Sequence, residues 1–188
     1  VYESYRHFNL TVRHNLRSNT NGRVITRNGI PRAVSLVKAP STDTLVHELG
    51  HVVDHTLRHR SADPREKDKR FGHIYADGES ASLAKEGQTL AQMKYSEGHT
   101  ELKDLWHRLE TDGFLSTSDE RRRKYLERFF LKYAYTPDEG FANAFALYVL
   151  DHKIALSVAP HHCEIISTLP NEHHDLRRTM EDLFSQEN

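Results

Sequence analysis

Cysteine is almost absent from this chain of 188 residues, in which Cys163 is the single example. One thiol excludes an internal disulfide framework and any metal cluster that is built from several cysteines. Long apolar runs are also missing. No run approaches the roughly 18 residues that a transmembrane helix needs, and the mean hydropathy is -0.73. We therefore expect neither a membrane span nor a disulfide scaffold.

An excess of charge of either sign is lacking as well. The chain has 26 basic and 27 acidic side chains and a net charge of -1. This balance excludes a chain that is dominated by a polybasic nucleic-acid-binding arm or by an acidic disordered tail. We therefore expect no nucleic-acid partner. The length suits one domain over residues 1–188. Because the chain begins at Val1 and shows no leader, we expect a mature protein or one module of a larger protein.

The first 40 residues have the pattern of a small sheet. Apolar and polar residues alternate over 7–13, which is typical of a half-buried strand. The pair Asn28-Gly29 is a hairpin-turn signal, and a second apolar segment follows at 30–37. Pro31 interrupts hydrogen bonding on one side, which favours an edge position for that strand. We expect a mostly antiparallel sheet over 1–40.

Helical periodicity begins after Pro40. Capping residues at 41–43 precede a helix that we expect over 43–59. Residues 60–98 lack a period and contain charge runs and glycines, so we expect an insertion that forms a surface excursion. The part from 99 to 188 is predicted to be mainly helical, with helices near 102–109, 118–133, 137–149, 161–168 and 171–185, the last behind Pro170. This order predicts the α+β class.

The centre of the 43–59 helix has the sequence His47-Glu48-Leu49-Gly50-His51. Two imidazoles four residues apart share one helix face, and Glu48 is turned by about 100° toward its flank. This H-E-x-x-H pattern is typical of zinc hydrolases. Although the chain has 14 histidines, composition alone would produce only about 0.08 such matches. The alternative is a helix with solvated histidines.

A third ligand is needed, because catalytic zinc usually takes three protein ligands and one water. Asp54 and His55 lie farther along the same helix and point away from a metal held by His47 and His51. A separate helix must therefore provide the ligand, and Glu139 is the candidate. Thr136 to Glu139 also reads as a T-x-x-E capping box, in which this carboxylate needs no metal. Spacing alone leaves both interpretations open.

Two segments together carry a family resemblance. HELGHVVD at 47–54 and EGFANAFALY at 139–148 resemble the catalytic domain of anthrax lethal factor and its relatives, which include secreted Pro-Pro endopeptidases. The resemblance implies a zincin-like fold with one zinc ion per chain. It implies His47, His51 and Glu139 as the zinc ligands and Glu48 as the general base.

The resemblance also implies an oxyanion-stabilising tyrosine shortly before the third ligand. Tyr133 is the better match and Tyr135 the runner-up, and the interval from Tyr133 to the glutamate looks one residue shorter than in the family. Related zincins often place a carboxylate at the position of Asn143, whose amide oxygen can still orient a ligand histidine. Asp54 either has this orienting role or is a charge on the helix face.

These residues predict a zinc metalloendopeptidase of the gluzincin type that acts on an extended polypeptide. We expect the substrate to add to an exposed sheet edge formed by Val34, Ser35, Leu36 and Val37. Two alternatives are an inactive zinc-binding toxin-type interaction module and a helical domain in which Glu139 only caps. Exported relatives and scarce cysteine favour secretion; the alternative is an intracellular or phage-borne module.

Overall fold

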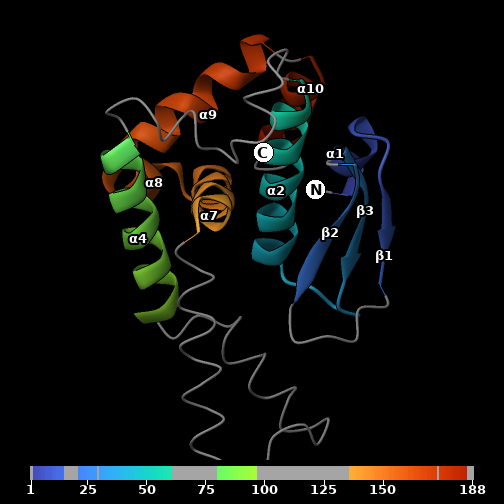
Figure 1. The fold of residues 1–188 in the computed structure, drawn as a ribbon, viewed down its shortest axis with the longest axis horizontal. Coiled ribbons are helices and arrows are strands. Elements are labelled where there is room, and N and C mark those ends of the chain that lie inside the picture. The colour runs from blue at the N-terminus through green and yellow to red at the C-terminus, as the bar shows by residue number, and fades with distance from the viewer. Residues whose placement is uncertain are drawn as a thin grey trace, which may run out of the picture.

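The computed structural model describes residues 2–14, 21–28, 30–60, 80–96, 136–172 and 174–185. The elements are α1 (Tyr2–His7), β1 (Thr11–Arg13), β2 (Gly22–Arg27), β3 (Ile30–Leu36), α2 (Thr42–Arg60), α4 (Ser80–Ser96), α7 (Pro137–Leu150), α8 (His152–Val158), α9 (Pro160–Glu172) and α10 (His174–Phe184). A small three-stranded sheet and a mostly helical remainder form a mixed α+β structure, as the sequence predicts (Figure 1). None of the described helices combines the length and apolar content that crossing a membrane requires.

The hairpin between β2 and β3 confirms the turn prediction. The two strands pair antiparallel, and Arg27 lies opposite Ile30 across the turn. Asn28 has a φ of 55°, in the left-handed region that the first central residue of a type I′ turn requires. Asparagine tolerates this conformation better than most residues do, so the local sequence determines where the chain reverses.

The strand order β1-β3-β2 contradicts the predicted edge position of β3. β3 is the central strand: Val34 pairs with Val12 of β1 on one side and with Val24 of β2 on the other. The expected exposed edge is therefore wrong for Val34 and Ser35, which have paired strands on both sides, whereas Leu36 and Val37, among the described residues, are bonded only toward β2, at Gly22 and Asn21. β2 pairs antiparallel with β3 along its whole length and the parallel β1–β3 pairing covers only Thr11–Arg13, so the sheet is mostly antiparallel, as expected, with one parallel pairing.

Pro31 is compatible with a central strand because of its position in the two ladders. The pairing of β3 with β1 starts only at Ala33, so no β1 partner requires an N–H group from Pro31. On the other side Pro31 lies opposite Thr26, next to a register shift between Ile25 and Thr26. Proline is tolerated at such irregularities, since the regular hydrogen bonding is already interrupted there.

The N-terminal segment differs from the predicted strand. Tyr2–His7 is a helix, and the strand is limited to Thr11–Arg13. The Tyr5 hydroxyl donates a hydrogen bond of 2.5 Å to the carbonyl oxygen of Leu45 in α2. Nε2 of His7 lies 2.6 Å from the Asp182 carboxylate in α10. Contacts with distant parts of the chain therefore stabilise α1, and local alternation could not reveal them.

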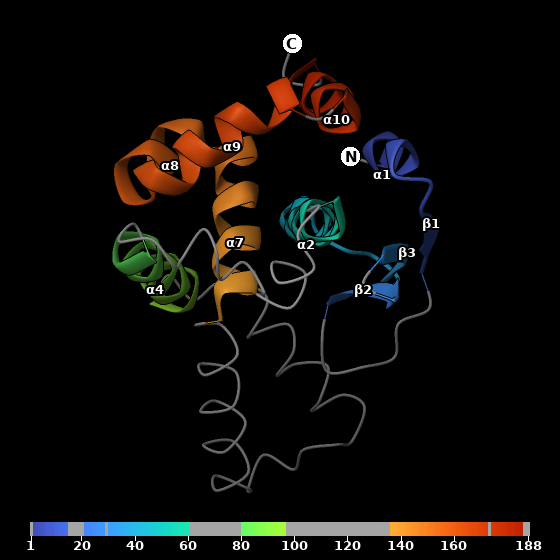
Figure 2. The ribbon, with the colours of Figure 1, turned by 45° about the horizontal axis from the view of Figure 1, so that its top comes forward.

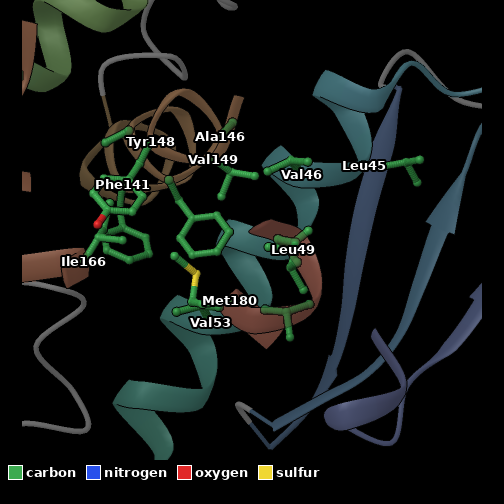
Figure 3. Close-up of a cluster of buried hydrophobic side chains, with 14 of the residues drawn as sticks. Leu45, Val46, Leu49, Val53, Phe141, Ala146, Tyr148, Val149, Ile166 and Met180 are labelled. Carbon is green, nitrogen blue, oxygen red and sulfur yellow. The ribbon is translucent and has the colours of Figure 1, made fainter. Parts of the chain in front are cut away.

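Helix α2 confirms the predicted helix to within one residue at each end. The backbone N–H of Thr44 donates to Oγ of Ser41 at 3.2 Å, which caps the N-terminus. The helix packs against the sheet and against α7, and Figure 3 shows some of the buried side chains of α2. Its buried apolar residues are Leu45, Val46, Leu49, Val52 and Val53. Each such side chain contributes about 1.5–3 kcal/mol when fully buried.

Helix α7 is the central helix of the described structure. It lies between α2 and α4, and α8 and α9 lie across one of its ends (Figures 1 and 2). The residues of α7 are apolar or small on most sides of the helix, which is typical of a helix that is buried all round. Phe141, Ala142, Ala144 and Phe145 are each at most 1% exposed. In the first turn of α7, Glu139 and Gly140 are buried as well, and Glu139 faces α2.

Helix α4 falls in the segment that the sequence predicts to be a surface excursion, and for 80–96 that prediction is wrong. Leu83, Leu90 and Ala91 are buried, and the helix packs against α7 and α9. A Cβ atom added to Gly87 would lie 3.5 Å from Cα of Gly140, so the α4 and α7 backbones are close. The helices expected near 102–109 and 118–133 lie outside the described residues.

Glu86 of α4 caps the N-terminus of α9. Its two carboxylate oxygens accept hydrogen bonds from the backbone N–H groups of His161 and His162, at 3.1 and 3.2 Å, and also contact both Nδ1 atoms. Burial acts to raise the pKa of Glu86, but the hydrogen bonds from the two histidines lower it below its ordinary value. The adjacent pair His161 and His162 therefore binds the carboxylate that caps α9.

Pro170 lies inside α9, whereas the sequence predicts that it precedes the last helix.

Candidate metal centre

Three side chains from two helices converge at the interface of α2 and α7. Nε2 of His47 lies 3.2 Å from Oε2 of Glu139, and Nε2 of His51 lies 3.1 Å from Oε1. The two imidazole rings are perpendicular, with centroids 4.8 Å apart. One donor atom from each residue lies within 4.8 Å of the others, so the group could hold a metal ion. His47 and Glu139 are buried and His51 is partly buried.

Glu139 faces α2 instead of closing the capping box. Thr136 is the N-cap residue of α7 and Pro137 occupies the first turn, as the sequence predicts. The Thr136 side chain makes no capping hydrogen bond. Both Glu139 oxygens are directed to the two histidines. The reciprocal side-chain pair of a capping box is therefore not formed, and the carboxylate is available as a ligand.

Gly50 allows α2 and α7 to approach closely enough for this arrangement. A Cβ atom at Gly50 would lie 2.8 Å from Cα of Ala142 and 3.2 Å from its carbonyl oxygen. Backbone atoms cannot turn aside as the end of a flexible side chain can. Ala142 is one turn after Glu139 on α7, so the same contact sets how far Glu139 lies from His47 and His51.

We expect Gly50→Ala to lower the free energy of unfolding by about 1–3 kcal/mol, because the methyl group overlaps the α7 backbone. The intrinsic preference for alanine in a helix, up to about 1 kcal/mol, acts in the opposite direction. Gly87→Ala in α4 is the matched control, since its methyl group has an ordinary contact at 3.5 Å. Urea unfolding measures both variants. Equal stability of Gly50→Ala and the wild type would contradict the close approach.

The electrostatics of the group favour a positive partner for Glu139. Burial by itself lowers the pKa of His51, but the adjacent Glu139 carboxylate outweighs this effect and raises the pKa to about 9. Burial acts to raise the pKa of Glu139, yet the charge of His51 and the histidine hydrogen bonds hold it well below its ordinary value. The carboxylate therefore stays ionised in the interior. Either a proton on His51 or a bound cation can balance its charge.

Glu48 lies beside the group rather than within it. It follows His47 on α2, its side chain is buried at 5% exposure, and it is not one of the three clustered ligands. Its negative charge still acts on His51 and contributes to the raised pKa of that residue. A buried carboxylate that is close to the ligands without joining them is suited to proton transfer at the site.

The remaining predicted site residues have different outcomes. Asp54 is fully buried and its charge acts on His51, so it is not a charge on an exposed helix face. Asn143 is buried one turn after Glu139 on α7. The roles of these two residues in orienting a ligand stay predictions. Tyr133 and Tyr135 lie outside the described residues.

The sequence reasoning missed Gly50 as a determinant of the site. A glycine in the middle of an otherwise regular amphipathic helix is costly, by about 1 kcal/mol relative to alanine. That cost is the available signal, because it indicates a close packing contact. The sequence could not name the partner, since the contact with Ala142 joins two helices that are far apart in the chain.

Comparison of the chain with protein-family models, with curated proteins and with solved structures found no match. The resemblance to lethal factor-type peptidases therefore stays a prediction from the two motifs. These motifs, at 47–54 and 139–148, lie on α2 and α7, which pack against each other. The case for a metal site depends on this convergence of donor atoms.

Proposed function

We propose that the chain is a zinc-dependent endopeptidase that hydrolyses an extended polypeptide. One observation carries the proposal: the buried Glu139 carboxylate meets Nε2 of His47 and of His51, and the buried Glu48 lies beside them. A merely structural ion pair needs one histidine and one carboxylate. Two histidines, a shared carboxylate and a neighbouring second carboxylate match the requirements of hydrolysis.

Zinc is the metal that we propose for this group. Two imidazoles and one carboxylate form a ligand set that catalytic zinc uses, with the fourth position open to water. All three ligands come from one chain, so one zinc ion per chain is expected. Bound zinc supplies Lewis acidity, which makes a coordinated water more acidic and polarises the carbonyl group under attack.

Proton transfer is the role that we assign to Glu48. Its carboxylate would accept a proton from the attacking water and pass it to the leaving amine. Burial at 5% exposure keeps bulk water from competing for that proton. The family resemblance adds Tyr133, with Tyr135 as the alternative, as a hydroxyl donor to the oxyanion, a contribution of about 3 kcal/mol for one good donor.

The free edge of β2 replaces β3 as the proposed substrate strand. Among the described strands, β2 pairs with β3 on one side only, which leaves its other edge open. β2 begins at Gly22, which lies directly against Glu48. An extended polypeptide that adds to this edge would gain backbone hydrogen bonds and would place its chain next to the metal ligands.

A peptide library tests the proposal. The protein loaded with one equivalent of Zn²⁺ is incubated with the library, and mass spectrometry identifies the products. We expect cleavage within a restricted set of sequences, loss of cleavage after treatment with a chelator, and recovery when Zn²⁺ is restored. The recovery step separates the requirement for the metal from damage by the chelator.

Tight binding of one zinc ion without any cleavage would contradict the endopeptidase proposal. That outcome would instead support the inactive zinc-binding interaction module. Absence of stable metal binding would contradict both, because His47, His51 and Glu139 would then form only a buried ion pair. Metal content of the dialysed protein, measured by mass spectrometry, distinguishes these results.

A further inference from the structure

Gly22 is the first residue of β2, and its missing side chain leaves the space that Glu48 occupies. A Cβ atom at Gly22 would lie 2.5 Å from Cδ of Glu48 and would also overlap Cγ and Oε1. The φ angle of Gly22 is outside the left-handed region, so backbone conformation does not require glycine here. Glycine is required at position 22 because the Glu48 side chain occupies the space of a Cβ atom.

We propose that Gly22 is a positioning residue that holds the Glu48 carboxylate at the flank of the His47–His51–Glu139 group. This inference deepens the proposed function, since it concerns the orientation of the group that would transfer the proton. Glu48 is on α2 and Gly22 is on the strand that faces it. The backbone of β2 at Gly22 therefore limits the directions in which the Glu48 carboxylate can turn.

The backbone around Gly22 is held by its pairing with β3. Gly22 pairs with Leu36, a fully buried residue of β3, and the N–H of Val37 donates to the carbonyl oxygen of Asn21 at 3.0 Å. Five residues, 37–41, connect β3 to α2 itself. The strand that carries Gly22 is therefore fixed, and the atoms that a new side chain would overlap first are those of the Glu48 side chain. The Glu48 carboxylate is the group that must move.

This asymmetry makes Gly22 different from Gly50. At Gly50 an added methyl group meets the backbone of Ala142, so the helices themselves must shift. At Gly22 the overlapping atoms are side-chain atoms of Glu48. We therefore expect Gly22→Ala to fold, to keep the three metal ligands in place and to displace the carboxylate. A misplacement of about 1 Å at a reacting group can lower the rate about 10²-fold.

An unfolding cycle on the metal-free protein tests the contact without any substrate. The four proteins are the wild type, Gly22→Ala, Glu48→Ala and the double variant. We expect Gly22→Ala to lower Tm by about 3–6 °C when Glu48 is present and to leave Tm unchanged or higher when Glu48 is alanine. Gly87→Ala, whose methyl group would contact Gly140 rather than Glu48, should behave alike with and without Glu48. The same effect of Gly22→Ala in both backgrounds would overturn the inference.

Cleavage kinetics test the positioning role once the library has provided a substrate. We expect Gly22→Ala to lower kcat about 10–10²-fold, with KM within about twofold and one zinc ion per chain as in the wild type. A wild-type kcat in Gly22→Ala would overturn the positioning role while the endopeptidase proposal stands. If the wild type cleaves nothing, the endopeptidase proposal fails, and the unfolding cycle still decides whether Gly22 confines Glu48.

Discussion

Glu48→Gln is expected to lower kcat for peptide cleavage about 10²–10⁴-fold, the usual contribution of a general base. The substitution keeps the shape of the side chain and its contact with Gly22, but the amide cannot accept the proton from water. Glu48 is not among the three clustered ligands, so one zinc ion should remain bound. Steady-state kinetics on a library-derived peptide, together with metal analysis of the same sample, measures both effects.

Glu164→Gln is the matched control for this prediction. It makes the same chemical change at an exposed position of α9, away from the metal group. Its kcat and metal content should equal those of the wild type. Wild-type cleavage by Glu48→Gln would remove Glu48 from the reaction, whereas loss of zinc in that variant would show that Glu48 supports the metal rather than the proton transfer.

Glu139→Gln is expected to weaken zinc binding by more than about 100-fold, because changes at groups that only support a ligand already cost 10–100-fold. A neutral amide also no longer provides the buried negative charge that the two histidines face. Dialysis against a competing chelator, followed by metal analysis, gives the affinity. Cleavage should decrease in parallel, since the same group would hold the metal for the reaction.

Glutamine, rather than alanine, at position 139 distinguishes a metal ligand from a residue that only closes the capping box. Glutamine closes a capping box as well as glutamate does, so a residue that only caps should tolerate Glu139→Gln without loss. Asp138→Asn is the matched control, because it removes a charge from the same first turn of α7. Equal zinc affinity in Glu139→Gln, Asp138→Asn and the wild type would support the cap-only interpretation and contradict the metal site.

Local signals in the sequence were sufficient for some elements. The apolar period and the capping serine at position 41 predict α2 to within one residue at each end. Asn28-Gly29 predicts the β2–β3 hairpin, and Thr136-Pro137 predicts the start of α7. In each of these cases the deciding interaction joins residues that are close in the chain, so the pattern is visible without the fold.

Other elements depend on contacts between distant segments, and their predictions were wrong. α1 is stabilised by contacts with Leu45 and Asp182, which a prediction of a sheet over 1–40 could not include. The position of β3 in the sheet is decided by β1, which pairs with it in parallel. α4 has a weak apolar period because its buried face includes Glu86, which caps α9, and Gly87, which lies close to α7. No local pattern contains that information.

The sequence by itself determined that His47 and His51 share one helix face, that Glu48 is displaced from them, and that a metal cluster of several cysteines cannot form. It left Glu139 open between a ligand and a cap. Only the tertiary structure shows that Glu139 faces both histidines, because the first turn of α7 packs against the middle of α2, where Gly50 permits the close approach. The physical reason is that helical spacing is a local property of the backbone. The meeting of a histidine pair with a carboxylate from a separate helix is instead decided by how two helices pack.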